Sequence, residues 1–598
     1  MVIVHGTRDR STRNQFSGTR PSFLEQLYLG RVRWDLLHPF PSQPDHDRAA
    51  GDGAVAELGR LLREHVDPEE VDRTGELPDA ALAALRDGGW LALGVDPELG
   101  GRGLSATNVF RVIQAAASWS VPVALVLAIQ ESIGTGAMHA TVSPGPLRDE
   151  LRRRVLARQV SGSADTEPSG AANRDRETTA RPVDGGAAYV LDGDKIHIGN
   201  GPIADVLTVS ATLRDGDRAE RRLFLVDTSA PGFEVVTAHR FLGVRGFPNG
   251  AVRLRGVRVP AWHLLDERPD GDDTRLTPRM LNLIVRGRMY LIAAPSLALA
   301  KRAAGWARDF VGRRAVDGVP LGRYEQVRHE LAECLADTYA VETACRWAML
   351  VDDGATATPG NALPEQMATK NISSVAAWRV VDRAMALMAA EGYETAASKR
   401  GRGAPDVPLE RAFRDARNFR ISGGVDFLLD YWSMTLIALT LYYPEPDDAA
   451  EIDAGPPDDR WCDEVPLSPE NREHLREVVR QVHRFAATCL RLARRFPDRA
   501  ELLARQRLLV LLGAIGNELH TAALVLARAA GAPAEADLAA AACRSARHRL
   551  AAHWRELAQR EHADPPGEEH WTTSGAGWTP DTDLVRPADD RAGDGVPR

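Results

Sequence analysis

The chain has 598 residues, which is too long for one simple core and sufficient for three or four packed units. Apolar residues make up 44% and charged residues 26% of it, the proportions of an ordinary globular protein. The net charge is −9 and neither half is basic, which argues against a nucleic-acid-binding protein. Nearly all positive charge is arginine, a usage typical of a GC-rich bacterium. The only four lysines are Lys195, Lys301, Lys370 and Lys399.

The five cysteines are scattered, odd in number and without a Cys-x-x-Cys pair. They are Cys334, Cys345, Cys462, Cys489 and Cys543. We therefore expect no disulfide framework and no metal site, which suits a reducing cytoplasm. No secretion signal is evident, and the longest apolar runs are about half of the ~18 residues that a membrane span needs. The sequence thus predicts a cytoplasmic protein without a membrane span.

Hydrophobic periodicity divides the first three quarters of the chain into blocks. Residues 1–48 form an N-terminal arm, and a helical period fills 49–160. Short alternating segments, separated by Gly, Asp and Pro turns, predict a β-module over 161–268. The helical period returns strongly over 269–445. Helices on both sides of a β-module predict the α+β class.

The last quarter contains three further segments. Residues 446–466 are acidic and rich in proline, which predicts a linker. Residues 467–563 are again helical, which predicts an extra helical domain. Residues 564–598 are rich in Asp, Gly and Pro and have no face to bury, so we expect a disordered tail.

Five motifs are distinctive. Pro97–Ser105 reads Pro-Glu-Leu-Gly-Gly-Arg-Gly-Leu-Ser, Thr166–Pro168 reads Thr-Glu-Pro, and Lys195–Gly201 reads Lys-Ile-His-Ile-Gly-Asn-Gly. Arg314–Leu321 and Arg411–Arg417 follow in the second helical block. Together with the β-module between two helical blocks, these motifs resemble the acyl-CoA dehydrogenase family over most of the chain.

The resemblance implies a fold and an oligomeric state. It implies an N-terminal helical domain, a central β-barrel domain and a C-terminal four-helix bundle. The arm and the extra helical block at 467–563 are similar to the very-long-chain branch, whose members are dimers, so we expect a homodimer. The family's reaction removes two vicinal hydrogens from an acyl thioester, with a carboxylate as base and FAD as hydride acceptor.

The catalytic base of the family has no counterpart in this chain. The usual Glu lies in an Ile-Tyr-Glu-Gly-Thr stretch, and here Ile421–Val425 reads Ile-Ser-Gly-Gly-Val, which puts Gly423 at the base position. A minority of the family places the Glu just before an Arg on an earlier helix, and here that pair is Gly287 and Arg288. Glycine cannot hold a proton, so the sequence predicts loss of standard dehydrogenation.

The flavin contacts also diverge. The resemblance assigns them to Thr166, Ala172, His197, Gly199 and Arg314. His197 replaces the aromatic residue beside the flavin ring, Gly199 the hydroxyl residue at N5, and Ala172 the Ser near the pyrophosphate. Thr166 and Arg314 match the family. The sequence thus indicates a degenerate FAD site, and it leaves open whether the cofactor is FAD or none.

Four polar residues are candidates for a new catalytic set in the same place: His197, Asp426, Asp165 and Arg288. A histidine with a carboxylate partner can transfer protons, so His197 with Asp165 or Asp426 is one hypothesis. The alternative is that these residues are solvated or ion-paired and perform no chemistry.

Three functions remain open. The first is a non-redox enzyme that acts on a CoA-bound or carrier-protein-bound acyl chain, in biosynthesis, by cyclisation, dehydration or isomerisation. The second is an FAD-dependent acyl-thioester oxidoreductase or a flavin monooxygenase with a relocated base. The third is a non-catalytic dimerising partner built on the same fold.

Overall fold

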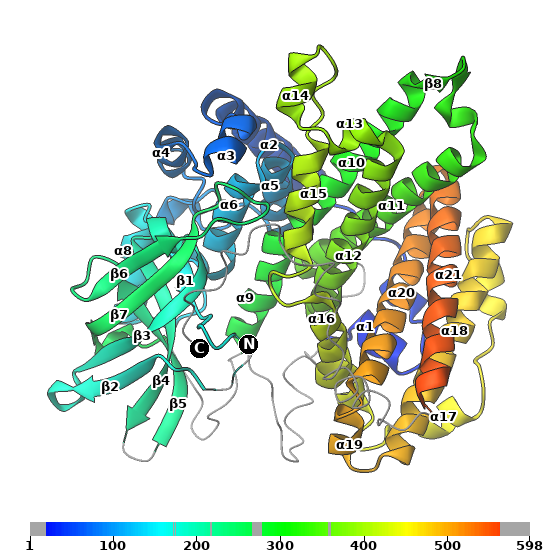
Figure 1. Cartoon of the computed structure of the whole chain (residues 1–598). Coiled ribbons are helices and arrows are strands. Elements are labelled where there is room, and N and C mark those ends of the chain that lie inside the picture. Colours follow the sequence, from blue (N-terminus) through cyan, green and yellow to red (C-terminus); the bar gives the residue numbers. More distant parts are fainter. Residues whose placement is uncertain are drawn as a thin grey trace, which may run out of the picture.

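The computed structural model describes residues 20–171, 173, 175–215, 218–265, 278–356 and 360–561. The expected disordered tail and the first 19 residues of the expected arm lie outside these ranges. The described part has a helical N-terminal domain, a central sheet, a C-terminal helical domain and further helices beyond it (Figure 1). This order confirms the predicted α+β class.

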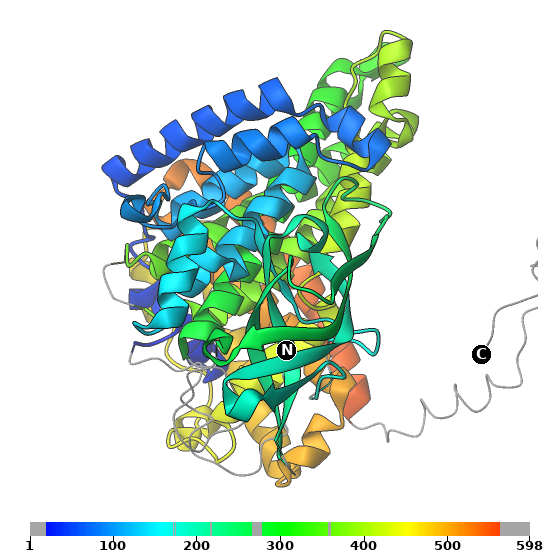
Figure 2. The ribbon, with the colours of Figure 1, turned by 90° about the vertical axis from the view of Figure 1, so that its left-hand side faces the viewer.

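The N-terminal helices follow the predicted helical period. They are α1 (Phe23–Tyr28), α2 (Asp45–His65), α3 (Pro68–Thr74), α4 (Asp79–Asp87), α5 (Ala106–Trp119), α6 (Val121–Ile133), α7 (Thr135–His139) and α8 (Pro146–Leu156). Figure 2 shows α2 across the outer side of this block, whereas α6 is buried along almost its whole length. That difference follows from composition, because α6 is apolar on all sides and α2 on one side only.

The central domain is a seven-stranded sheet. Its strands are β1 (Ser161–Ala164), β2 (Thr179–Val183), β3 (Ala188–Gly199), β4 (Val206–Asp215), β5 (Arg218–Asp227), β6 (Phe233–Ala238) and β7 (Asn249–Pro260). Their order is β1-β4-β2-β3-β7-β6, and β5 pairs with β4. β4 runs parallel to β1 and β2, and the other pairs are antiparallel. The sheet curls around an apolar core that includes Leu191, Phe224 and Val252.

The second helical block follows the sheet. It contains α9 (Pro278–Arg288), a π-helical turn (Met289–Ala293), α10 (Ala294–Arg313), the hairpin β8 (Ala315–Val316) and β9 (Val319–Pro320), α11 (Glu325–Asp352), α12 (Leu363–Met388), α13 (Ala390–Tyr393), α14 (Ala396–Gly401), α15 (Leu409–Phe419) and α16 (Asp426–Trp432). α10, α11 and α12 pack against one another, and α15 and α16 pack against α12. The turn between α15 and α16 contains Gly423, the residue at the position of the family's usual base.

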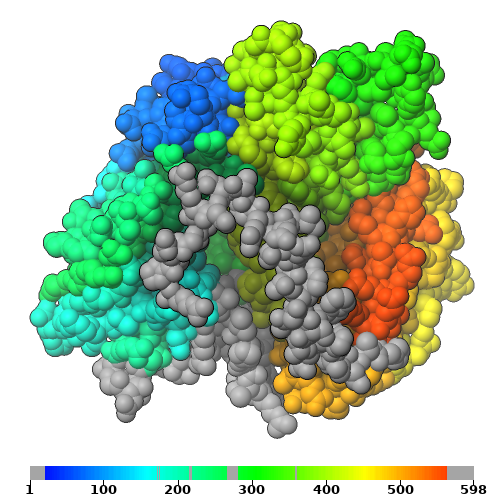
Figure 3. Space-filling model, viewed as in Figure 1, coloured from blue at the N-terminus to red at the C-terminus, as the bar shows by residue number. Residues whose placement is uncertain are grey.

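The extra helical domain shares a core with the bundle. Its helices are α17 (Ala449–Asp453), α18 (Pro469–Arg495), α19 (Arg499–Leu503), α20 (Gln506–Gly531) and α21 (Ala536–Glu561). One apolar cluster joins residues of α1, α11 and α12 to residues of α18, α20 and α21. The segment expected as a linker contains α17 and a 3₁₀ helix, and its Ile452 and Cys462 are buried. Figure 3 shows the sheet domain on one side of the molecule and these helices on the other.

Three helical stretches are long and apolar enough to cross a membrane by length and composition. They are Val121–His139, Leu281–Arg313 and Gln506–Gly531, and 78% to 83% of the most apolar window of each is buried inside the protein. The stretches are longer than the apolar runs that the sequence suggested, because helices continue through Gly and polar residues. Packing within the protein accounts for their apolar composition.

Candidate functional site

The turn between α15 and α16 presents Gly423 at an exposed position. Its φ is +70°, in the left-handed region that favours glycine. A Cβ at this position would lie 3.4 Å from Cγ1 of Ile292 and 3.8 Å from Cε of Lys370. The place of the family's carboxylate is therefore bordered by the side chain of a lysine.

The second base position is closed by packing. A Cβ at Gly287 would lie 2.5 Å from Cβ of Ser132, a separation that real Cβ atoms essentially never show. A glutamate at residue 287 would require α6 and α9 to move apart. Both positions at which the family places its base therefore lack a carboxylate, and at Gly287 the side chain of Ser132 on the neighbouring helix occupies the space.

Lys370 lies on α12 beneath the turn and is fully buried. Its Nζ donates a hydrogen bond to the carbonyl oxygen of Gly424, at 2.7 Å. Burial lowers the pKa of Lys370 to about 7, and the positive charge of Arg288 contributes to the lowering. Arg288, on α9, is 8% exposed, and burial lowers the pKa of its guanidinium to about 10. Lys370 thus borders the position of the missing base, and the buried Arg288 acts on it electrostatically.

Two carboxylates on α16 oppose these cations. Asp426 accepts a hydrogen bond from Nε of Arg420, at 2.8 Å. Asp430 accepts hydrogen bonds from the side-chain amides of Asn371 (2.7 Å) and Asn517 (2.8 Å), while burial raises its pKa to about 7. The negative charges of both carboxylates raise the pKa of Lys370, but they do not outweigh its burial.

His197, Asp165 and Asp426, which the sequence suggested as a catalytic set, each contact other residues in the structure. The exposed ring of His197 packs against the ring of His239, with centroids 4.9 Å apart. Asp165 is bound by Arg176 and by Arg221, the latter at 2.6 Å. Burial would raise the pKa of Asp165, but these guanidinium groups hold it well below its usual range. Each carboxylate is thus already bound by arginine.

Of the residues that the resemblance assigns to FAD, Gly199 has other side chains close to the place of the family's hydroxyl residue. A Cβ at Gly199 would lie 2.9 Å from Cζ of Phe247 and 3.0 Å from Cδ1 of Ile129, so those side chains fill the space of the hydroxyl residue. Thr166 is half-buried, and Arg314 is exposed beside the β8–β9 hairpin. Ala172 lies outside the described residues.

The models of three acyl-CoA dehydrogenase domains match consecutive parts of the chain. The acyl-CoA dehydrogenase N-terminal domain matches residues 54–163, the middle domain matches 162–257, and the C-terminal domain matches 278–427. The chain belongs to the acyl-CoA dehydrogenase family. The sequence resemblance is thereby confirmed.

Relatives of this family member include two named dehydrogenases. The protein named probable acyl-CoA dehydrogenase FadE10 in Mycobacterium tuberculosis is 32% identical over 417 residues, which cover 68% of this chain and 61% of that protein. The mitochondrial very long-chain specific acyl-CoA dehydrogenase of Mus musculus is 26% identical over 431 residues, which cover 70% and 63%. This chain thus spans about three fifths of the length of these relatives.

A solved structure shares the fold over nearly the whole chain. The acyl-CoA dehydrogenase of Bacillus anthracis, whose crystal structure is complexed with FAD, superposes with a TM-score of 0.74 at 18% identity. The match covers 93% of this chain and 94% of that one, so it includes the extra helical domain. At this identity the likeness shows the fold alone.

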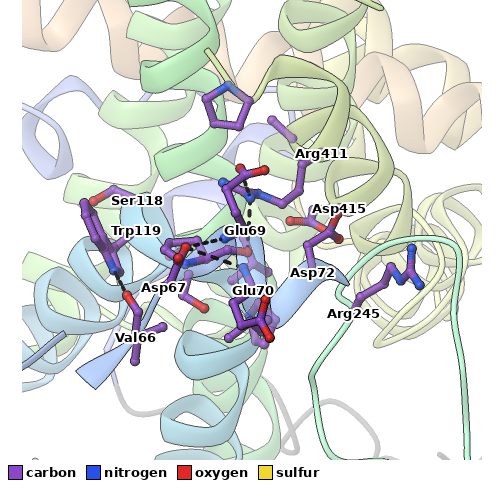
Figure 4. Close-up of a pocket in the computed structure, with 18 of the residues that line it drawn as sticks. Val66, Asp67, Glu69, Glu70, Asp72, Ser118, Trp119, Arg245, Arg411 and Asp415 are labelled. Atoms are coloured by element: carbon purple, nitrogen blue, oxygen red, sulfur yellow. Dashed lines mark hydrogen bonds and ion pairs between the residues drawn. The ribbon is translucent and has the colours of Figure 1, made fainter. Parts of the chain in front are cut away.

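A cavity of about 660 Å³ lies away from the Gly423 turn, among α3, the α5–α6 turn, α10 and α15 (Figure 4). Its carboxylates have partners: Glu69 pairs with Arg411, and Asp415 accepts a hydrogen bond from the backbone N–H of Val244, at 2.5 Å. Burial raises the pKa of Asp415 to about 6. Across the described ranges, no three His, Cys, Asp or Glu side chains are placed to hold a metal ion.

The sequence prediction of the site omitted Lys370. The signal that identifies it is the scarcity of lysine in a chain dominated by arginine. Lys195, Lys370 and Lys399 are all fully buried in the structure. Arginine cannot lose its proton, whereas a buried lysine readily does, so a lysine kept at a buried position is a candidate for chemistry.

Proposed function

We propose that this protein binds an acyl thioester, carried by CoA or by a carrier protein, and catalyses a non-redox step on it. Isomerisation, cyclisation and dehydration are the candidate reactions, in a biosynthetic setting. The observation that supports the proposal is Gly423, whose surroundings hold a buried lysine where α,β-dehydrogenation requires a carboxylate.

Chemistry links this observation to the reaction class. Dehydrogenation needs a base for the α-proton and a hydride acceptor for the hydrogen on the β-carbon. The packing of Phe247 and Ile129 against Gly199 disfavours the usual hydride acceptor, FAD. A catalytic base can still move protons along an acyl chain when no hydride acceptor is bound. The fold of the family supplies the binding site for the chain, and the altered residues direct the reaction away from oxidation.

The test combines binding with a redox assay. Octanoyl-CoA and palmitoyl-CoA are titrated into the purified protein by calorimetry, and each complex is then mixed with FAD and an artificial electron acceptor. We expect acyl-CoA to bind, the acceptor to stay oxidised and no enoyl-CoA to form. Stoichiometric reduction of the acceptor with enoyl-CoA formation would contradict the proposal.

An FAD-dependent oxidoreductase or flavin monooxygenase with a relocated base is the second candidate. Thr166 and Arg314, which match the family's flavin contacts, favour it. It predicts a yellow protein that reduces the acceptor in the same assay. A non-catalytic homodimeric partner predicts an unchanged acyl-CoA in every assay.

A further inference from the structure

We propose that Lys370 is the general base that removes and returns the α-proton of the bound acyl thioester. This inference rests on the proposed function and names the group that performs its first step. It goes beyond the four catalytic candidates of the sequence, none of which borders the position of the missing base as closely as Lys370 does.

Position is the first argument. Gly423 is exposed, and a Cβ on it would lie 3.4 Å from Cγ1 of Ile292 and 3.8 Å from Cε of Lys370. Lys370 reaches the same turn from the buried side, where its Nζ contacts the carbonyl oxygen of Gly424 at 2.7 Å. Lys370 therefore borders the turn position at which the family carries its glutamate.

Hydrogen bonding distinguishes Lys370 from the other two buried lysines. Lys195 donates to three acceptors: the carboxylate of Glu167 at 2.8 Å, the hydroxyl of Ser210 at 3.2 Å and the carbonyl of Asp165 at 3.4 Å.

Lys399 donates to two carbonyl oxygens, those of Glu391 and Val407. Within the described ranges, Lys370 donates to one acceptor, the carbonyl oxygen of Gly424. A buried ammonium with three donors is poorly satisfied by one acceptor, whereas a neutral amine keeps a lone pair for a proton.

Burial favours the neutral form of the amine, and the charges around it act in both directions. Burial has the largest effect, followed by the guanidinium of Arg288 on α9, and Arg420 at the end of α15 acts in the same direction. Asp426 and Asp430 on α16 act in the opposite direction. The pKa of about 7 leaves a large fraction of the amine unprotonated at neutral pH, which suits a general base.

The proposed step balances without an oxidant. As the α-carbon–hydrogen bond breaks, the lone pair on Nζ forms an N–H bond, and the electron pair of the broken bond moves into the thioester as an enolate. The ammonium then returns its proton to the α-carbon or to a conjugated carbon. The first outcome is exchange, and the second is isomerisation of an unsaturated chain.

Exchange of the α-protons of octanoyl-CoA with D₂O tests the proposal, with mass spectrometry as the readout. We expect the wild-type protein to catalyse exchange, and Lys370→Met to lose at least about 100-fold of the rate. Lys301→Met is the matched control, because Lys301 is a surface lysine that pairs with Glu342 on α11, and it should exchange at the wild-type rate.

The pH dependence of exchange supplies a readout that a structural role would not move. The rate should rise with pH through the pKa of Lys370. Arg288→Gln removes a positive charge that lowers this pKa, so the midpoint of the variant's pH–rate profile should shift to higher pH. Asp426→Asn removes a negative charge that raises this pKa, so the midpoint of that variant's pH–rate profile should shift to lower pH.

Three outcomes overturn the proposal. One is a folded Lys370→Met protein that exchanges at the wild-type rate, and another is a midpoint that neither Arg288→Gln nor Asp426→Asn moves. The third is a wild-type protein that binds octanoyl-CoA without exchange, which leaves binding, and with it the proposed function, intact. Absence of octanoyl-CoA and palmitoyl-CoA binding would instead contradict the proposed function itself.

Discussion

Glycines stand at three positions where the resemblance expects functional side chains: Gly199, Gly287 and Gly423. The sequence alone predicts the loss of these side chains. It cannot predict what occupies the space, because that depends on contacts between distant segments. In the structure, Phe247 and Ile129 pack against Gly199, and Ser132 packs against Gly287. These neighbours occupy the space that a larger side chain at either position would need.

The close contact at Gly287 gives a stability prediction. Gly287→Ala would place a Cβ 2.5 Å from that of Ser132, and overpacking of this kind costs about 1–3 kcal/mol. Gly305→Ala, on α10, is the matched control because no atom lies within 4 Å of its added Cβ. Urea unfolding should show the first variant destabilised and the second stabilised by roughly 0.4–1 kcal/mol. Equal stability of the two variants would contradict the packing account.

At the scale of elements, periodicity predicts the helical blocks and the β-module, and the structure confirms both. It does not predict how the arm binds. Ser22 Oγ and the backbone N–H of Leu24 donate to Oε1 of Glu365 on α12, at 2.8 Å and 2.9 Å. The sequence alone would place a glutamate such as Glu365 on the surface of its helix, because charged side chains are rarely buried. Tertiary packing of the arm against α12 buries it.

That contact predicts a pH dependence of stability. Burial raises the pKa of Glu365 from its ordinary value of 4.5 to about 8, so the folded chain holds this proton more tightly than the unfolded chain does. The contribution of Glu365 to stability should therefore fall as the pH rises from about 4.5 to about 8. Glu365→Gln keeps the hydrogen bonds and removes the titration. Thermal unfolding across this range should show a shallower decline for the variant, and parallel curves would contradict the prediction.

At the scale of the molecule, the candidate site joins segments that are far apart in the chain. Gly423 and Asp426 belong to the turn and helix after α15, Lys370 to α12 and Arg288 to α9. The sequence located the turn and Arg288 through the family resemblance. It grouped His197, Asp165 and Asp426 by their chemistry, whereas the fold binds the two carboxylates to arginines. Ion pairing between segments is decided by tertiary structure, which sequence spacing does not encode.

The visible absorption spectrum of the purified protein tests the central claim most directly. It is measured before and after the protein is incubated with excess FAD and desalted. The claim is that the site of this family member no longer holds the flavin that dehydrogenation requires. We expect a colourless protein that stays colourless after desalting. Flavin absorption bands retained in stoichiometric amount would contradict the account and favour the flavin-dependent alternative.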